Sequence, residues 1–270
     1  MQDAPQPDVT IITICFRNPD EVEQTLRSIA LLAAHGMESI VVDGSPDDSC
    51  RAVIAAFPFA RHLHGPDRGK YDALNKGVAA ALGRTIIFMN SGDHFHNPNK
   101  FIALIEQHRG RLGDHIIYGD CIKIIAGQEI AVPAPTIDPV TLRTGVLPSH
   151  QSIVMPADWL RTHPFDDQLD FAADTKLLKR AFLELRSIYV AAPIAIFAFG
   201  GISASPGRWK KLVQQHRELV AVHELTRTEA IRLALFLVRR KFAHLVIGEA
   251  GLQKVQAARL RARLRRDTPA

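Results

Sequence analysis

Short apolar runs alternate with amphipathic segments in the first third of the chain. Residues 9–16 (VTIITICF) form a nearly continuous β-branched run, which is typical of a strand buried on both faces. Further strands are expected at 39–42 and, more strongly, at 85–89 (TIIFM). The segments between them predict helices at 21–32, 48–57 and 72–82 and a weak strand at 61–63. This alternation predicts an α/β fold, with a mostly parallel central sheet and helices on both faces.

The pattern is looser after Asp93. The sequence predicts a helix at 101–108, a β pair from 115–125 and 130–132, loops over 133–150, a helix at 171–183 and a strand at 187–199, closed by Gly200-Gly201. From residue 206 onward the spacing is helical. We therefore expect an α/β domain over residues 1–204, with halves at about 9–96 and 97–204, and C-terminal basic helices over 205–270.

Two aspartates follow strands of the predicted sheet. Asp43 precedes a Gly-Ser-Pro turn, and Asp93 lies in the segment NSGDHF. Ligands of open α/β sheets bind at the carboxyl ends of strands, so both are candidate site residues. Asp43 could accept hydrogen bonds from a base or ribose, or cap an Asx-turn. Asp93 could hold Mg²⁺ or Mn²⁺, which prefer oxygen ligands, or it could be a turn or helix-cap residue.

Two predicted helix starts also carry candidate chemistry. The segment 66–77 (PDRGKYDALNKG) places basic and acidic side chains at a helix N-terminus, which suits a diphosphate but equally describes a well-capped, solvated helix. Asp174, flanked by small apolar residues, could be a general base with a raised pKa or an N-cap carboxylate, with Asp170 as its nearest competitor. His150 lies in a loop and could contact a phosphate, an acceptor or only the protein.

Several other classes of site are not supported. Neither the phosphate-binding GxxxxGK[ST] spacing nor a dinucleotide-binding GxGxxG occurs. The three cysteines are far apart in the sequence and form no CxxC pair, as expected of reduced thiols in a cytosolic protein. The N-terminus MQDAPQPDV lacks the basic and apolar regions of a signal peptide.

The net charge of +5 is unevenly distributed, since residues 205–270 hold 15 Lys+Arg against 5 Asp+Glu. An apolar stripe at helical spacing runs through this tail, through Ile231, Ala234, Leu235, Val238, Phe242 and Leu245. Such a helix could lie on an anionic membrane surface, at roughly 1 kcal/mol per basic residue, or pack on the α/β domain. No aromatic platform accompanies the charge, so nucleic-acid binding is not expected. The apolar stretch 230–238 is too short to span a bilayer.

In this order, the segments resemble the family-2 glycosyltransferases of the GT-A fold. VTIITICFRNPDEVEQTLRSI is similar to the family's opening strand and helix, and SIVVDGSPDDS is similar to its VVDGxSxD segment. PDRGKYDALNKGVAAALGRTIIFMNSGDHF matches the stretch that runs into the metal-binding acidic motif. The match is dense over residues 9–96 and sparser to about 204. SHQS and FAADTKLLKR resemble the subset that includes colanic-acid-type exopolysaccharide transferases.

The resemblance implies an inverting glycosyltransferase with a nucleotide-binding half at 9–96 and an acceptor half at 97–204. It implies a UDP- or GDP-sugar donor and a saccharide or lipid-linked acceptor of the cell envelope or an exopolysaccharide. The enzyme would be cytoplasmic, and the tail could hold it at the inner face of the plasma membrane. The implied roles are a nucleotide pocket at Thr13 and Phe16, base or ribose recognition by Asp43, proximity of Asp67 and Asn75 to the nucleotide or donor sugar, Mn²⁺ or Mg²⁺ coordination by Asp93, and proton removal by Asp174.

The chain departs from the family pattern at two places. The acidic motif usually has another Asp where Ser91 or Gly92 stands, so Asp93 and the donor phosphates alone could hold the metal. Arg17 stands where an Asn is common; Asn18 could substitute, or Arg17 could contact a phosphate. Two alternatives therefore stay open. A same-fold nucleotidyltransferase would need a Gly-rich loop after the first strand, which is missing, and a non-catalytic nucleotide-sugar-binding module is compatible with the altered motif.

Overall fold

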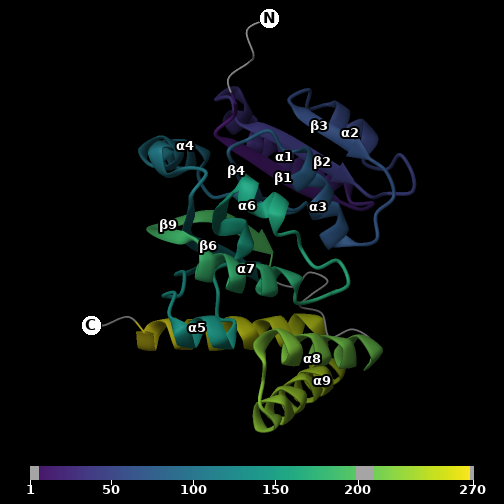
Figure 1. Cartoon of the computed structure of the whole chain (residues 1–270). Coiled ribbons are helices and arrows are strands. Elements are labelled where there is room, and N and C mark those ends of the chain that lie inside the picture. The colour runs from purple at the N-terminus through teal and green to yellow at the C-terminus, as the bar shows by residue number, and fades with distance from the viewer. Residues whose placement is uncertain (1–5, 199–208, 268–270) are drawn as a thin grey trace, which may run out of the picture.

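The computed structural model describes residues 6–198 and 209–267, and a nine-stranded mixed sheet forms its centre (Figure 1). The strand order is β3-β2-β1-β4-β8-β6-β9-β5, with β7 paired to β6. The strands are β1 Val9–Cys15, β2 Glu38–Asp43, β3 Ala60–His64, β4 Thr85–Phe88, β5 His94–Phe95, β6 His115–Ile125, β7 Gln128–Val132, β8 Ile153–Pro156 and β9 Arg186–Ala198.

The four strands β3, β2, β1 and β4 are parallel to one another, as the alternating sequence pattern predicts. Each antiparallel pairing includes a strand that lies after residue 90. The expected α/β fold is confirmed, and the regular parallel part coincides with the most regular part of the sequence. The expected β pair is the antiparallel hairpin of β6 and β7.

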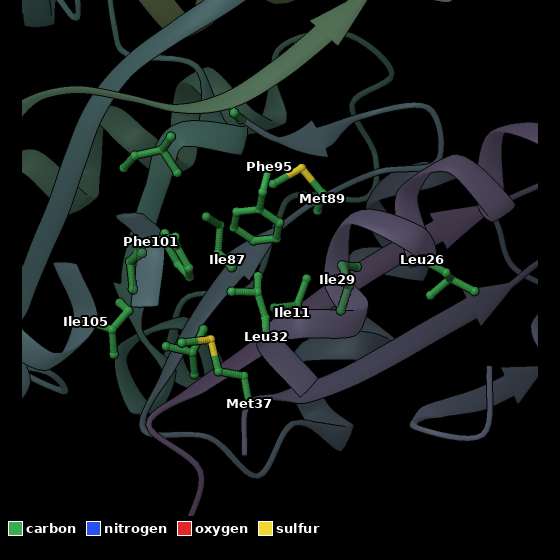
Figure 2. Packing of buried hydrophobic residues seen from close by; sticks show 14 of the residues in the cluster. Ile11, Leu26, Ile29, Leu32, Met37, Ile87, Met89, Phe95, Phe101 and Ile105 are labelled. Atoms are coloured by element: carbon green, nitrogen blue, oxygen red, sulfur yellow. The ribbon is translucent and has the colours of Figure 1, made fainter. Parts of the chain in front are cut away.

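Helices cover both faces of the sheet and create two cores. On one face, α1 (Pro19–Ala34), α2 (Arg51–Ala55) and α4 (Pro98–Gln107) pack on Ile11, Ile87 and Met89 (Figure 2). On the other face, α3 (Lys70–Ala80), α6 (Ala157–Thr162) and α7 (Ala173–Glu184) pack on Ile12 and Phe88. Successive side chains of a strand point to opposite faces, so Ile11 and Ile12 enter different cores. This is why β1 reads as a continuous apolar run.

Some boundaries differ from the sequence prediction. The helix expected at 48–57 is confined to α2, and the one expected at 72–82 begins earlier, at Lys70, and ends at Ala80. The predicted loop region contains α5 (Pro139–Thr144), where Asp138 forms a capping box and proline occupies the first turn. Short 3₁₀ helices lie at Arg109–Arg111 and His150–Ser152.

The C-terminal part consists of α8 (Trp209–His223) and α9 (Arg227–Asp267), at the end of the molecule remote from β3 (Figure 1). A positive φ of 68° at Gly248 kinks α9. After the kink, α9 packs through Ala257 and Leu264 on the hairpin of β6 and β7. No helix among the described residues is both long and apolar enough to cross a membrane. The expected boundary at 204/205, Gly200-Gly201 and the strand end at Phe199 lie outside the described residues.

Candidate functional site

The carboxyl ends of β1, β2 and β4 bring the two strand-end aspartates to one edge of the sheet. Asp43 is the last residue of β2 and pairs with Cys15, the last residue of β1. On the other side of β1, β4 runs into the segment that ends at Asp93. Asp43 and Asp93 therefore share an edge, with β1 between them, as the pattern of strands predicts.

Asp43 is fully buried, and its carboxylate is held by its own turn. The backbone N–H of Ser45 donates to Oδ1 over 2.9 Å, and Nε2 of His62 lies 3.3 Å from Oδ2. Burial alone would raise the pKa of Asp43, but the hydrogen bonds from Ser45 and His62 outweigh it and hold the pKa below its usual value. The hydrogen bond from Ser45 is the one expected if Asp43 caps an Asx-turn. Recognition of a base or ribose by Asp43 stays a prediction.

Asp67 lies against the same turn. A Cβ at Gly44 would collide with the Asp67 carboxylate, so only glycine leaves room for this approach. The backbone N–H of Gly69 donates to Asp67 Oδ1 over 2.9 Å. The structure therefore brings Asp67, in the loop after β3, against the turn that follows Asp43 at the end of β2.

Asn75 has a different environment from the one expected. Its Nδ2 donates to the carbonyl of Phe165, and its Oδ1 accepts from the Phe165 N–H, each over 2.9 Å. Both ends of the amide are thus engaged in fastening α3 to the loop before α7. A structural contact accounts for Asn75, and its proximity to a donor stays a prediction.

The two residues expected to line the nucleotide pocket differ in accessibility. Phe16 directly follows β1 and is 57% exposed, with the Arg17 guanidinium 5.7 Å from its ring centroid, so the ring lies at the surface, where a planar base could stack on it. Thr13 is fully buried within β1, and its hydroxyl has no hydrogen-bond partner among the described residues. The structure therefore places Phe16, and not Thr13, at the surface of the edge.

The loop after β1 joins the β2 and β4 ends. The N–H of Arg17 donates to Ser45 Oγ over 2.8 Å, while its guanidinium pairs with Asp47 at 2.9 Å. The Asn18 amide donates to Ser91 Oγ over 2.6 Å. Asn18 thus contacts the acidic motif that follows β4. The Arg17 side chain instead pairs with Asp47, in the loop after β2.

Asp93 is buried, and the described residues give it no cationic partner. Gln151 Nε2 donates to its Oδ2 over 3.0 Å. Burial raises the pKa of Asp93 to about 7, and the negative charge of Glu21 adds to this effect, while the Gln151 bond opposes it. A buried carboxylate without a compensating cation fits a divalent ion, whose charge would offset the cost of burial.

The described residues would supply few further ligands for such an ion. Within residues 6–198 and 209–267, the one group of three or more acidic, His or Cys side chains close enough to share an ion is Cys15, Asp43 and Cys50, which does not include Asp93. Cys15 and Cys50 are 35 positions apart in the sequence, and the fold brings them together. Burial raises the pKa of the Cys15 thiol, which favours the neutral form over a metal-binding thiolate. An ion at Asp93 would therefore need donor phosphates and water.

Asp174 lies in the first turn of α7 and faces two residues of other elements. The Tyr71 hydroxyl donates to its Oδ1 over 3.2 Å, and His150 Nδ1 lies 3.8 Å from its Oδ2. The N-cap of α7 is Ala172, so Asp174 is not at the N-cap position, although its Oδ1 accepts from the backbone N–H of Thr175 in the first turn over 2.8 Å. Its carboxylate is instead partly accessible beside a tyrosine and a histidine, an arrangement suited to accepting a proton.

His150 connects Asp174 to the acidic motif. Asn90 Nδ2 lies 3.2 Å from His150 Nε2, and Nδ1 on the other side of the ring lies 3.8 Å from Asp174 Oδ2. Burial lowers the pKa of His150, and the negative charge of Asp174 opposes that effect. Sequence reasoning assigned no role to Asn90, Gln151 or Tyr71; all three lie inside or beside the motif segments, but only the fold shows what they contact.

The basic residues of segment 66–77 are mostly paired within the protein. Arg68 pairs with Asp72 at 2.9 Å and also with Asp167, and Lys76 pairs with Asp72 at 2.9 Å. The α3 N-cap is Gly69, and no side chain caps it. For Arg68 and Lys76 the structure matches the alternative of a solvated, internally paired helix start.

Comparison with known proteins adds evidence that the geometry alone cannot supply. An uncharacterized glycosyltransferase of Mycobacterium tuberculosis is 26% identical over 203 residues, which cover 73% of this chain and 78% of that protein. The succinoglycan biosynthesis protein ExoO of Rhizobium meliloti is 32% identical over 104 residues, 37% of this chain and 30% of that protein. The shorter second match is confined to part of each chain.

Solved structures share the fold at low sequence identity. Residues 1–349 of TarS from S. aureus superpose with a TM-score of 0.57 at 15% identity, over 87% of this chain and 72% of that one. A mannosyltransferase of Pyrobaculum calidifontis, in complex with GDP-Man and Mn²⁺, gives a TM-score of 0.57 at 16% identity, over 94% and 80%. The fold is therefore the GT-A fold. The model of the glycosyl transferase family 2 matches residues 10–156, more than half of the chain, so this protein belongs to glycosyltransferase family 2.

Proposed function

We propose that this enzyme transfers a sugar, with inversion, from a UDP- or GDP-sugar to an exopolysaccharide or cell-envelope acceptor. One observation carries the proposal: side-chain contacts run along the sheet edge toward the candidate base. The turn that holds Asp43 contacts the loop after β1 through the bond between Ser45 and Arg17. The next residue of that loop, Asn18, donates to Ser91. From Asn90, beside Ser91, the contacts continue through His150 to Asp174. Nucleotide, phosphate and acceptor chemistry would then be arranged along one edge.

Inversion requires a single displacement at the anomeric carbon. Asp174 would remove the proton of the acceptor hydroxyl as its oxygen bonds to the anomeric carbon, while the bond to the diphosphate oxygen breaks. Phe16 would stack on the base and Asp43 would bind the base or ribose. A divalent ion at Asp93, when bound, would stabilise the charge of the departing nucleoside diphosphate. The mannosyltransferase complex with Mn²⁺ supports this assignment by analogy.

The acceptor is proposed from the relative in succinoglycan biosynthesis and from the resemblance to colanic-acid-type transferases. Both point to a growing exopolysaccharide, either free or lipid-linked. A nucleotidyltransferase would instead release pyrophosphate, and a binding module would release nothing. The identity of the phosphate product therefore separates the three functions.

A panel of UDP-glucose, UDP-N-acetylglucosamine and GDP-mannose, with and without Mn²⁺, tests the donor. The correct donor is expected to raise the melting temperature most, because a ligand that binds only the folded state stabilises it by mass action. The same donor should release nucleoside diphosphate on incubation, and the anomeric configuration of the product, measured by NMR, should be inverted. Retention, or release of pyrophosphate, would contradict the proposal.

We further propose that α9 binds an anionic membrane surface. The predicted stripe is exposed and not packed on the domain: Ile231 is 60%, Leu235 52%, Phe242 55% and Leu245 62% exposed. Arg232 and Arg239 lie beside it and are also exposed. Apolar side chains flanked by arginines match a bilayer interface with anionic headgroups, and would place the enzyme at the inner face of the plasma membrane.

Replacing Leu235 and Phe242 together by serine is expected to reduce binding to vesicles of phosphatidylglycerol and phosphatidylcholine by about tenfold or more, because both side chains would lose apolar contact with the acyl chains. Co-sedimentation at low salt measures this. The matched control is Val255→Ser, since Val255 is also exposed but lies beyond the kink. Wild-type protein that stays in the supernatant with anionic vesicles would contradict the membrane assignment.

A further inference from the structure

A glutamate of the C-terminal part caps the segment that precedes the candidate base. Glu218 lies in α8 and is only 7% exposed. Its carboxylate accepts hydrogen bonds from three consecutive backbone N–H groups, those of Asp170 at 3.0 Å, Phe171 at 2.8 Å and Ala172 at 3.1 Å. The residues it caps lie 46 to 48 positions earlier in the chain.

This contact fixes the turn that leads into α7 and does not replace an N-cap: a capping side chain accepts from N–H groups of the first helical turn, whereas Glu218 accepts from the three N–H groups just before that turn. Ala172 is the N-cap of α7 and has no side chain that could accept from the backbone N–H groups. A carboxylate at a helix N-terminus also interacts favourably with the helix dipole. Charge-assisted hydrogen bonds to three adjacent amides fix the backbone of the segment more firmly than a neutral cap would.

Other contacts between α8 and the α7 region reinforce the arrangement. Gln214 Nε2 donates to Glu218 Oε1 at 3.1 Å and to Asp170 Oδ2 at 2.8 Å. Lys179 Nζ, further along α7, donates to the carbonyl of Val222 at 2.8 Å. The helix that carries the candidate base is therefore held by α8 at its start and in its middle.

The capped segment leads directly into Asp174. Asp174 is the second residue of α7, two positions after Ala172. Its contacts with Tyr71 at 3.2 Å and His150 at 3.8 Å come from α3 and from the loop before β8, so they depend on where α7 begins. A shift of about 1 Å in a catalytic group can reduce a rate by roughly a hundredfold.

We propose that Glu218 is a positioning residue: through the three N–H groups it sets the place of Asp174 relative to the acceptor hydroxyl. The C-terminal part is thereby a component of the active site and not an appendage of it. This inference rests on the proposed role of Asp174 as the base. It assigns no contact between Glu218 and a substrate.

The test compares Glu218→Gln with Glu224→Gln, a change at an exposed glutamate that lies just after α8. The amide introduced by Glu218→Gln would keep the volume of the side chain but lose the charge and one acceptor oxygen. Release of nucleoside diphosphate, with water as the acceptor, is expected to fall tenfold to a hundredfold in kcat for Glu218→Gln. The KM for UDP-glucose, UDP-N-acetylglucosamine or GDP-mannose, whichever the protein binds, should stay within about twofold, because the donor edge is not altered. Glu224→Gln should behave as the wild type.

A double-mutant cycle separates positioning from a general loss of structure. In an Asp174→Asn background, Glu218→Gln should cause little further loss, since the group it positions is already absent. Additive losses, or an unchanged kcat in Glu218→Gln, would overturn the inference. If Asp174→Asn alone keeps the wild-type rate, the proposed base fails instead, so the two failures are distinguishable.

Hydrogen exchange provides a readout that does not depend on activity. The amides of Asp170, Phe171 and Ala172 should exchange faster in Glu218→Gln, while those of β1 stay protected. If Glu218→Gln does not fold, Gln214→Leu removes one partner of Glu218 and is expected to lower kcat in the same direction by a smaller factor. Unchanged kcat and unchanged exchange in that variant would also overturn the inference.

Discussion

Asp174→Asn is expected to lower the rate of nucleoside diphosphate release, at saturating donor, by a hundredfold or more. General-base catalysis contributes about 10²–10⁴ to the rate of a typical enzyme, and an amide cannot accept the proton. The substitution conserves shape, and the amide oxygen that it introduces can still accept from the Tyr71 hydroxyl, which is 3.2 Å from the carboxylate in the wild type. The fold and donor binding should therefore survive, and kcat should fall while the thermal shift caused by donor is kept.

Asp170→Asn is the matched control, because Asp170 is the nearest carboxylate in the sequence and lies in the same capped segment. Its side chain is exposed, and its Oδ2 accepts from Gln214. An asparagine oxygen can accept the same bond, so we expect a change of less than about threefold, the size of a minor surface perturbation. If the rate falls more in Asp170→Asn than in Asp174→Asn, Asp170 and not Asp174 is the base. Wild-type rates in Asp174→Asn would remove the base assignment.

The sequence was sufficient to locate the edge of the sheet where the candidate site lies. Parallel strands end at one edge, so residues that follow β2 and β4 had to approach each other whatever their side-chain contacts. The ends of β2 and β4 predict Asp43 and Asp93 for this reason, whereas the role of Asp67 is implied only by the resemblance to family 2. The predictions for Asp43 and Asp93 depend on strand order and on local turn chemistry, both of which leave a pattern in the sequence.

Contacts between distant segments leave no such pattern. Asn75 and Phe165 are 90 positions apart, and a polar residue on a helix next to a basic neighbour looks the same whether it binds a phosphate or a backbone group. Glu218 is one acid among many charged residues in a basic tail, and nothing local marks it as buried. The pairing of Arg68 with Asp167 likewise depends on the loop before α7.

The C-terminal part shows an intermediate case. The helical spacing of the apolar stripe was readable, but spacing alone could not decide between a membrane and a protein partner. The structure divides the tail at Gly248: the stripe before the kink is exposed, and the segment after it packs on β6 and β7. The packing alternative therefore describes the part of α9 after Gly248, and membrane binding by the exposed part before it stays a proposal.

Asp93→Asn is expected to lower kcat/KM for the donor by a hundredfold or more, because it removes the one carboxylate assigned to the ion, and charge stabilisation by a metal is worth several kcal/mol in a transition state. Mn²⁺ should then no longer increase the thermal shift produced by the donor. The bond from Gln151, 3.0 Å in the wild type, can be made to an asparagine oxygen as well, so the fold should be kept.

A control at a second acidic residue of the same edge distinguishes a bound ion from general electrostatics. Asp47 is exposed and pairs with Arg17, so Asp47→Asn removes a negative charge near the loop after β1 without touching the acidic motif. Exposed pairs contribute little, so the Mn²⁺ response should be retained in Asp47→Asn. If the response to Mn²⁺ is the same in the wild type and in Asp93→Asn, the ion does not bind at Asp93. If the wild type is fully active in the presence of a chelator, the reaction does not need the ion, and the metal assignment of Asp93 fails.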